Sequence, residues 1–217
     1  MKVELQKRIK TSFILLTILT FVISFNQIIF AISLFILSVH CFNEWCNMNT
    51  KYFRKEKINY FLIKLFGFIY IFIFFISSLL LRGNSNESLI FLIITLLICI
   101  CSDVGGFVVG KFVGGKKLTR ISPNKTISGS VGSFIFSLLP LTLFHFLEIS
   151  FVFSLINILY SILISLFCQI GDLLISYFKR LNKIKDTGNI LPGHGGLLDR
   201  VDGIIFAVPV SFALKLL

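Results

Sequence analysis

Charged residues are scarce in this chain of 217 residues, where Asp, Glu, Lys and Arg together make up only 14%. Hydrophobic residues make up 56%, and the mean hydropathy of +0.93 lies far above that of a water-soluble domain. The apolar stretches also lack the alternation of apolar and polar residues that an outer-membrane β-barrel requires. The composition therefore predicts an all-α, polytopic integral membrane protein with no room for a separate soluble domain.

Cysteine is sparse as well, with five residues, and the spacing excludes a zinc site. Cys99 and Cys101 are closely spaced, but no second Cys-x-Cys pair occurs elsewhere in the chain to complete a set of four zinc ligands. The cysteines are therefore expected to be small apolar fillers. No small-residue cleavage site follows the apolar stretch at 11–24, so we expect this stretch to be retained rather than removed as a signal peptide.

The apolar residues fall into runs that are long enough to predict about seven transmembrane helices. A helix needs about 20 residues to cross a hydrocarbon core of about 30 Å. The first two runs are shorter than this, and the sequence leaves open whether they cross fully. The runs are 11–24, 27–42, 61–81, 88–109, 131–147, 151–175 and 203–217.

The distribution of basic residues predicts the orientation in the membrane. Lys and Arg gather before the first run and after the second, fourth and sixth runs, whereas the connections 82–87 and 147–150 carry only Arg82. By the positive-inside rule, the N-terminus and the basic connections lie in the cytoplasm, which predicts an inner-membrane protein with a cytoplasmic-face active site. The net charge of +11 would then attract anionic lipid headgroups, and we expect no nucleic-acid partner.

A polar block at residues 176–202 separates the last two apolar runs. Its glycine-rich turn, at Gly193, Gly195 and Gly196, precedes a predicted helix start, where backbone N–H groups favour an anion. Asp199 and Asp202 are three residues apart and would share one face of that helix, where they could hold a divalent cation. A solvated basic loop would explain the lysines of the block but not its glycines and paired carboxylates. The block therefore suits a phosphate-rich, metal-bound substrate.

A second cluster begins at Asp103, near the end of an apolar run where a carboxylate is costly. Gly106, Gly110 and Gly114 follow at four-residue spacing, and this spacing could equally serve close helix packing. Packing does not explain Asp103, however, and this leaves a functional role open for that carboxylate.

Ser122, Lys125 and Thr126 lie in a predicted turn that opens the next helix. Hydroxyl groups and a lysine at a helix start can bind a phosphate.

A third group of polar residues starts at Asp172, deep in the sixth run. Ser176 and Lys179 follow at i+4 and i+7 on the same predicted helix face. Pairing of Asp172 with a neighbouring lysine is the alternative to a ligand role. His194 could act as a base or could hydrogen-bond the backbone of its tight turn. Glu44 and Trp45 end the second run, and their position predicts an interfacial anchor.

The polar block resembles the signature of the phosphatidate cytidylyltransferases, also called CDP-diacylglycerol synthases. The order Ser-x-x-Lys-Arg, four residues, Lys-Asp-x-Gly and then Pro-x-His-Gly-Gly-x-x-Asp-Arg-x-Asp is met at every fixed position between Ser176 and Asp202.

The cluster at 103–129 resembles another stretch of the same family, whose members commonly show Asp-x-x-Ala-Tyr-x-x-Gly and Ser-Pro-x-Lys-Thr-x-Glu-Gly. Gly106, Phe107 and Ser128 depart from this pattern. Ser128 replaces a glutamate, which puts in doubt any metal or ribose contact of that glutamate.

The resemblance implies the transfer of a cytidylyl group from CTP to phosphatidate, giving CDP-diacylglycerol and pyrophosphate. Asp172, Asp199 and Lys125 are the implied catalytic residues. The two aspartates would hold Mg²⁺, and a second cation is left open. The implied substrate-binding residues are Asp103, Ser122, Thr126, Ser176, Lys179, Arg180, Lys185, Asp186, Gly193, His194, Gly195, Gly196, Arg200 and Asp202.

We therefore expect residues 1–89 to form N-terminal transmembrane helices and residues 90–217 to form the membrane domain that carries the family motifs. The expected partners are CTP, phosphatidate and the lipid bilayer, and a homodimer is left open. Two other functions are left open as well. One is a CTP-dependent kinase of a polyprenol or isoprenoid alcohol, and the other is a small transporter or lipid-binding scaffold that uses intramembrane carboxylates.

Overall fold

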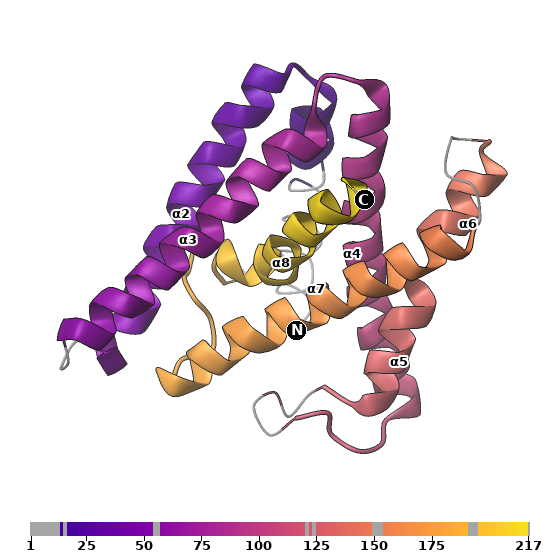
Figure 1. Ribbon diagram of the computed structural model, residues 1–217. Helices are drawn as coiled ribbons and strands as arrows, with labels where there is room; N and C mark the ends of the chain where they lie inside the picture. Colours follow the sequence, from indigo (N-terminus) through magenta and orange to yellow (C-terminus); the bar gives the residue numbers. More distant parts are fainter. Residues whose placement is uncertain are drawn as a thin grey trace. The chain divides into compact units, whose positions relative to one another are not determined.

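A computed structural model of the chain describes residues 14, 17–53, 57–119, 122, 125–148, 154–190 and 195–216. Within these residues the structure is helical, and one isolated antiparallel bridge joins Lys117 to Thr126 (Figure 1). The all-α prediction is confirmed. The helices are α2 (Gln27–Phe53), α3 (Lys57–Arg82), α4 (Asn86–Val113), α5 (Ile127–Phe136), α6 (Leu139–Phe146), α7 (Leu155–Leu181) and α8 (Leu198–Lys215).

Five segments of the described chain are long and apolar enough to span a membrane, which fits a multi-pass membrane protein. The segments are Gln27–Thr50, Ile58–Arg82, Asn86–Val113, Ile127–Phe146 and Leu155–Leu181. The first predicted run is only partly described, and α8 carries four charged residues and Pro209. The count of about seven stays a prediction.

The segment Ile127–Phe146 is interrupted, which the apolar run at 131–147 did not indicate. Helix α5 ends at Phe136, and α6 starts at Leu139 with Pro140 in its first turn. Proline suits this position because its missing N–H would have no partner at a helix start, and its fixed φ angle is already helical. The chain therefore covers this span in two short helices.

The chain divides into two compact units. Unit 1 comprises Met1–Leu79 and Phe178–Val201, and unit 2 comprises Leu80–Tyr177 and Asp202–Leu217. Helices α7 and α8 each contribute residues to both units. The division at residue 89 that we expected from the motifs stays a prediction.

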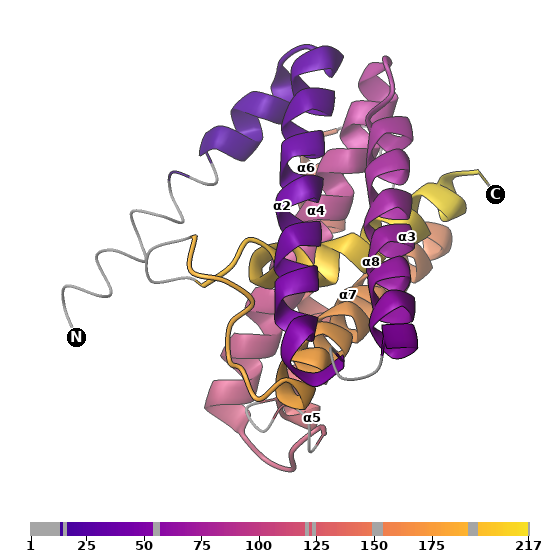
Figure 2. The ribbon, with the colours of Figure 1, turned by 90° about the vertical axis from the view of Figure 1, so that its left-hand side faces the viewer.

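In unit 1, α2 and α3 lie side by side as an antiparallel hairpin (Figures 1 and 2). The indole of Trp45 donates to the backbone oxygen of Ile63 at 2.9 Å and covers Gly67, where a Cβ would lie 2.1 Å from the ring. The same indole packs edge-on against Phe178, with ring centroids 4.7 Å apart. Trp45 is only 1% exposed, so the predicted interfacial anchor is wrong.

In unit 2, glycines allow α4 and α5 to pack at close range. A Cβ at Gly132 would lie 2.8 Å from the backbone oxygen of Gly105, and a Cβ at Gly129 would lie 2.7 Å from that of Gly106. Helix packing therefore accounts for Gly106. Gly114 instead caps the end of α4 with φ +64°, a conformation that favours glycine.

Three buried hydroxyl groups join α4, α7 and α8 within unit 2. The hydroxyl of Thr95 lies 2.7 Å from that of Tyr160 and 2.8 Å from that of Ser211, and the last two are 2.6 Å apart. Gly203 of α8 also contacts α7, where a Cβ would lie 2.5 Å from the sulfur of Cys168. These contacts fix the helices that carry the polar residues of this unit.

Candidate functional site

The turn between α4 and α5 presents Lys125 immediately before a helix start, as the sequence predicted. Backbone bonds close the turn, since Ile127 N donates to Lys116 O at 3.0 Å and Leu118 N donates to Lys125 O at 2.8 Å. Thr126 then caps α5, because its hydroxyl accepts from the backbone N–H of Gly129 at 3.1 Å.

Lys125 forms an ion pair with Asp172 of α7, and the two side chains remain 27% and 31% exposed. Ser176, one turn along α7, donates to the same carboxylate at 3.3 Å. Asp103 of α4 lies within electrostatic range of both Asp172 and Lys125, and it accepts a long contact of 3.9 Å from the thiol of Cys168. We call Asp103, Lys125, Asp172 and Ser176 the open cluster. It contains two carboxylates and one lysine, and the lysine pairs with Asp172.

The hydroxyls of Ser128 and Thr126 are engaged by the protein. The hydroxyl of Ser128 donates to the backbone oxygen of Gly114 and lies 3.0 Å from the hydroxyl of Thr126. The backbone oxygen of Ser122 accepts from Lys125 N at 3.1 Å. These contacts shape the turn, and the phosphate-binding roles of Ser122 and Thr126 stay predictions.

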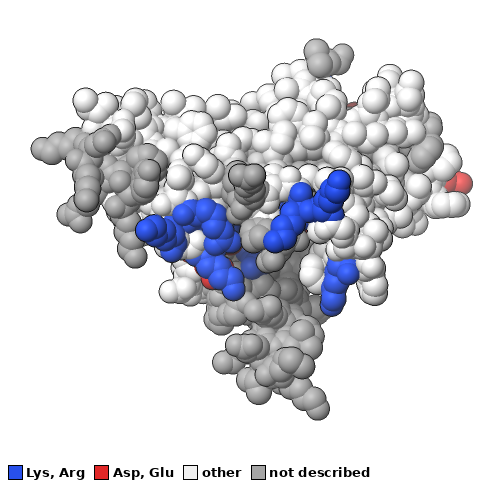
Figure 3. All heavy atoms as spheres, turned by 90° about the horizontal axis from the view of Figure 1, so that it is seen from below, with Lys and Arg blue, Asp and Glu red and all other residues white. Residues whose placement is uncertain are grey.

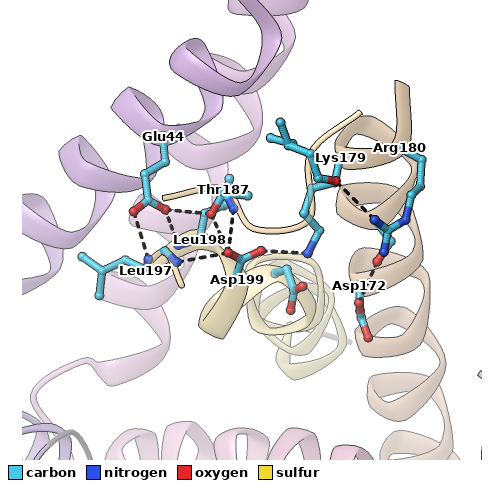
Figure 4. Close-up of polar contacts among 12 residues, drawn as sticks. Glu44, Asp172, Lys179, Arg180, Thr187, Leu197, Leu198 and Asp199 are labelled. Carbon is cyan, nitrogen blue, oxygen red and sulfur yellow. Dashed lines mark hydrogen bonds and ion pairs between the residues drawn. The ribbon is translucent and has the colours of Figure 1, made fainter. Parts of the chain in front are cut away.

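Asp199, in the first turn of α8, is surrounded by donors of unit 1 (Figure 4). One oxygen accepts from Lys179 Nζ at 2.7 Å. The other accepts from the backbone N–H groups of Thr187 at 2.7 Å and Gly196 at 3.1 Å, and it lies 3.0 Å from the Thr187 hydroxyl. The Asp199 side chain is 6% exposed. Burial raises its pKa, but the bonds from Lys179 and the two backbone N–H groups outweigh burial and hold the pKa below its ordinary value.

Glu44 of α2 completes this arrangement (Figure 4). Its carboxylate accepts from the backbone N–H groups of Leu197 at 3.0 Å and Leu198 at 2.8 Å, and it lies 3.0 Å from the Thr187 hydroxyl. Sequence reasoning missed Glu44, because it precedes these partners by more than 140 residues and belongs to no motif. We call Glu44, Lys179, Thr187 and Asp199 the closed cluster.

The N–H groups at the start of α8 thus donate hydrogen bonds to the protein's own carboxylates. A Cβ at Gly196 would lie 2.5 Å from Glu44 Oε2, and Gly195 has φ +82°, so both positions require glycine. The predicted approach of Gly195 and Gly196 to a triphosphate stays a prediction. Gly193 and His194 lie outside the described residues.

The remaining predicted substrate-binding residues lie on the surface or bond locally. Arg180, Lys185, Asp186 and Arg200 are exposed. Asp202 accepts from Gly203 N at 2.8 Å, so its contact differs from those of Asp199, although the two stand three residues apart on α8.

In unit 2, Lys111, Lys116 and Lys117 are also exposed. Figure 3 shows exposed Lys and Arg side chains on the face that it draws.

The oxygen ligands of the open cluster suit a hard divalent cation. Among the described residues no three metal-ligating side chains come together. Mg²⁺ is commonly held by only one or two carboxylates together with substrate phosphates, so Asp172, with Asp103 in electrostatic range, fits such a site. Asp199 would first have to release donors that it holds here.

Comparison with known proteins matches residues 53–217 to the cytidylyltransferase family. The chain is 35% identical over 226 residues to the phosphatidate cytidylyltransferase of Rickettsia typhi, covering 99% of this chain and 93% of that protein. It is 40% identical over 137 residues to the phosphatidate cytidylyltransferase of Staphylococcus saprophyticus, covering 62% of this chain. It is 42% identical over 128 residues to that of Staphylococcus aureus. The match spans about half of each staphylococcal relative, 52% and 48% respectively.

Proposed function

This chain belongs to the cytidylyltransferase family, and on that basis we propose that it transfers the cytidylyl group of CTP to phosphatidate, forming CDP-diacylglycerol and pyrophosphate. The observation that carries the proposal is the similarity to the Rickettsia typhi protein, because it extends over nearly the whole of both chains. The proposed reaction is a nucleotidyl transfer, and the chain is a transferase of phospholipid biosynthesis.

In the proposed reaction a phosphate oxygen of phosphatidate attacks the α-phosphorus of CTP. One P–O bond forms there, and the bond from the α-phosphorus to the bridging oxygen of the β-phosphate breaks, so that pyrophosphate leaves with that electron pair. A phosphomonoester has a second pKa of about 6 and is largely dianionic at neutral pH. The reaction therefore needs no strong base, and the main barrier is the approach of two anions.

The open cluster has the groups that this approach requires. Lys125 is a point charge at a helix start, where it would bind a phosphate of CTP. Asp172, with Asp103 near it, would hold Mg²⁺, and Asp199 is a further candidate ligand. When bound, the ion would neutralise charge on the phosphates. Ser176 donates to Asp172 and orients the carboxylate.

We further propose that the site faces the cytoplasm, from which CTP comes, whereas the lipid enters from the bilayer of the inner membrane. The support is the concentration of basic residues in alternate connections. In a variant without native cysteines, Lys117→Cys and Lys183→Cys should react with a membrane-impermeant reagent only from the cytoplasmic side, and Asn84→Cys only from the other side. Reaction of Lys183→Cys from outside would overturn the orientation. The homodimer stays a prediction, which cross-linking of the protein in membranes would test.

The activity is tested with purified protein, phosphatidate, Mg²⁺ and CTP that is radioactive at either the α- or the γ-phosphate. The proposal expects the α-label in the lipid product and the γ-label in pyrophosphate. Transfer of the γ-label to a lipid would instead support a CTP-dependent kinase, and no transfer from either position would contradict both enzyme functions.

A further inference from the structure

Glu44 is a buried carboxylate that is held, among the described residues, by two backbone N–H groups and a hydroxyl, and this calls for an explanation. It is 5% exposed, on a helix that is long and apolar enough to span a membrane. Burying a carboxylate is costly unless donors compensate the charge. The compensation comes from the Leu197 and Leu198 N–H groups and the Thr187 hydroxyl. The start of α8 adds its positive dipole end.

Two glycines make this contact possible. A Cβ at Gly188 would lie 2.5 Å from Glu44 Oε1, and a Cβ at Gly196 would lie equally close to Glu44 Oε2. Both glycines belong to the polar block, eight residues apart. The polar block is therefore shaped around the Glu44 carboxylate.

Thr187 links Glu44 to Asp199. Its hydroxyl lies 3.0 Å from an oxygen of each carboxylate, and its backbone N–H donates to Asp199 at 2.7 Å. Asp199 in turn accepts from Lys179 at 2.7 Å. Glu44 thus stands at one end of a continuous chain of hydrogen bonds that reaches two residues of the family signature.

The next turn of α2 supports the same segment of unit 1. Asn49 is fully buried, and its side-chain oxygen accepts from Asn182 Nδ2 at 3.1 Å. Trp45 packs against Phe178 near the end of α7. This face of α2 therefore contacts both ends of the polar block, although it carries no motif.

We propose that Glu44 is a positioning residue for cytidylyl transfer. It fixes the start of α8 and Thr187, and through Thr187 it holds Asp199 and Lys179 in their reactive orientation. This inference rests on the proposed function, because the orientation matters only if these residues serve that reaction. The N-terminal helices would then contribute to the active site as well as to membrane anchoring.

The test compares Glu44→Gln with the wild type and with Glu87→Gln, which removes an exposed glutamate from the first turn of α4. Glutamine keeps the shape of Glu44 but has only one acceptor oxygen, so its amide N–H₂ must face a donor. We expect turnover to fall about ten- to a hundred-fold. Hydrogen exchange in residues 195–200 should become several-fold faster, and exchange in α5 should not change. Glu87→Gln should behave as wild type in both measurements.

Wild-type turnover and wild-type exchange in Glu44→Gln would overturn the proposal. Faster exchange in every helix alike would also overturn it, because it would indicate a general loss of stability. Hydrogen exchange is measured without nucleotide. An inactive wild type would therefore contradict the proposed function, while the exchange measurement would still test whether Glu44 fixes the start of α8.

A second variant keeps the proposal testable if Glu44→Gln does not fold. Thr187→Val removes the linking hydroxyl but keeps the N–H bond to Asp199, and it should lower turnover about ten-fold. If both variants fold, the double variant should lose little more than Glu44→Gln alone, because both act through one link. If the fold-losses in turnover of the two single variants multiply in the double variant, the route through Thr187 is contradicted. Wild-type turnover in Thr187→Val would also contradict it.

Discussion

Asp172 and Asp199 have the same side chain and opposite surroundings. Asp199 accepts from Lys179, Thr187 and Gly196 and is 6% exposed. Asp172 pairs with Lys125, accepts from Ser176 at 3.3 Å and is 31% exposed. A carboxylate with both oxygens engaged by the protein is held in one orientation and fixes the groups that donate to it. One with free acceptor capacity can bind a cation or orient a substrate.

The two clusters also differ in how their charge is balanced. Each contains two carboxylates and one lysine. In the closed cluster, backbone N–H groups and the start of α8 supply the missing positive charge. In the open cluster, Asp103 adds a second carboxyl group within electrostatic range of Asp172. This difference favours the open cluster as the place for a metal ion and anionic phosphates.

The largest effect is expected for Asp172→Asn. Asparagine keeps the shape but removes the charge that a hard divalent ion requires, so turnover should fall at least about a hundred-fold. The unfolding temperature should change little, because the side chain is partly exposed. Steady-state turnover and thermal unfolding of the same preparation check this. Near-native turnover at ordinary Mg²⁺ concentrations would remove Asp172 from the metal site.

Asp199→Asn should lower turnover, because Asp199 belongs to the proposed site, and it should also lower stability. It leaves Lys179 without its charged partner in a buried site, which costs about 3 kcal/mol. The pKa of Asp199 lies below its ordinary value, so its contribution is fully present above that value and is lost as the pH falls through the depressed pKa. The difference in unfolding free energy between wild type and variant should therefore be constant near neutral pH and shrink below about pH 4. A difference that grew on acidification would contradict this account.

Lys125→Ala removes the cation of the open cluster. The lost charge-assisted contact should weaken the use of CTP about ten- to a hundred-fold, with a smaller effect on the use of phosphatidate. Initial rates with each substrate varied in turn separate the two effects. If only the phosphatidate requirement rose, the turn before α5 would belong to the lipid side of the reaction.

The smallest effect is expected for Ser128→Ala, because Ser128 serves the turn through its bond to Gly114 O. The unfolding free energy should fall by about 1 kcal/mol. Turnover should stay within a few-fold of wild type. A hundred-fold loss would indicate that Ser128 contacts the substrate and fills the role of the glutamate that is usual in the family.

Much of this arrangement was predictable from local sequence. The α8 start after Gly196 and the turn that presents Lys125 follow from short-range patterns. Pairing of Asp172 with a neighbouring lysine was the alternative to a ligand role, but its partner Lys125 lies 47 residues away, beyond any short-range pattern. Glu44 could not be found in this way, because its partners lie more than 140 residues along the chain and no spacing rule connects them. Its burial reversed the anchor prediction for the Glu44–Trp45 pair. The break between α5 and α6 was also missed, because Pro140 stands inside an otherwise continuous apolar run.

The most direct test of the account follows the oxygen atoms. Phosphatidate with heavy oxygen in its phosphate group is incubated with CTP, Mg²⁺ and the purified protein, and the products are weighed by mass spectrometry. If the lipid phosphate attacks the α-phosphorus, CDP-diacylglycerol retains every labelled oxygen and pyrophosphate contains none. Heavy oxygen in pyrophosphate, or a lipid pyrophosphate product formed together with CDP, would contradict cytidylyl transfer.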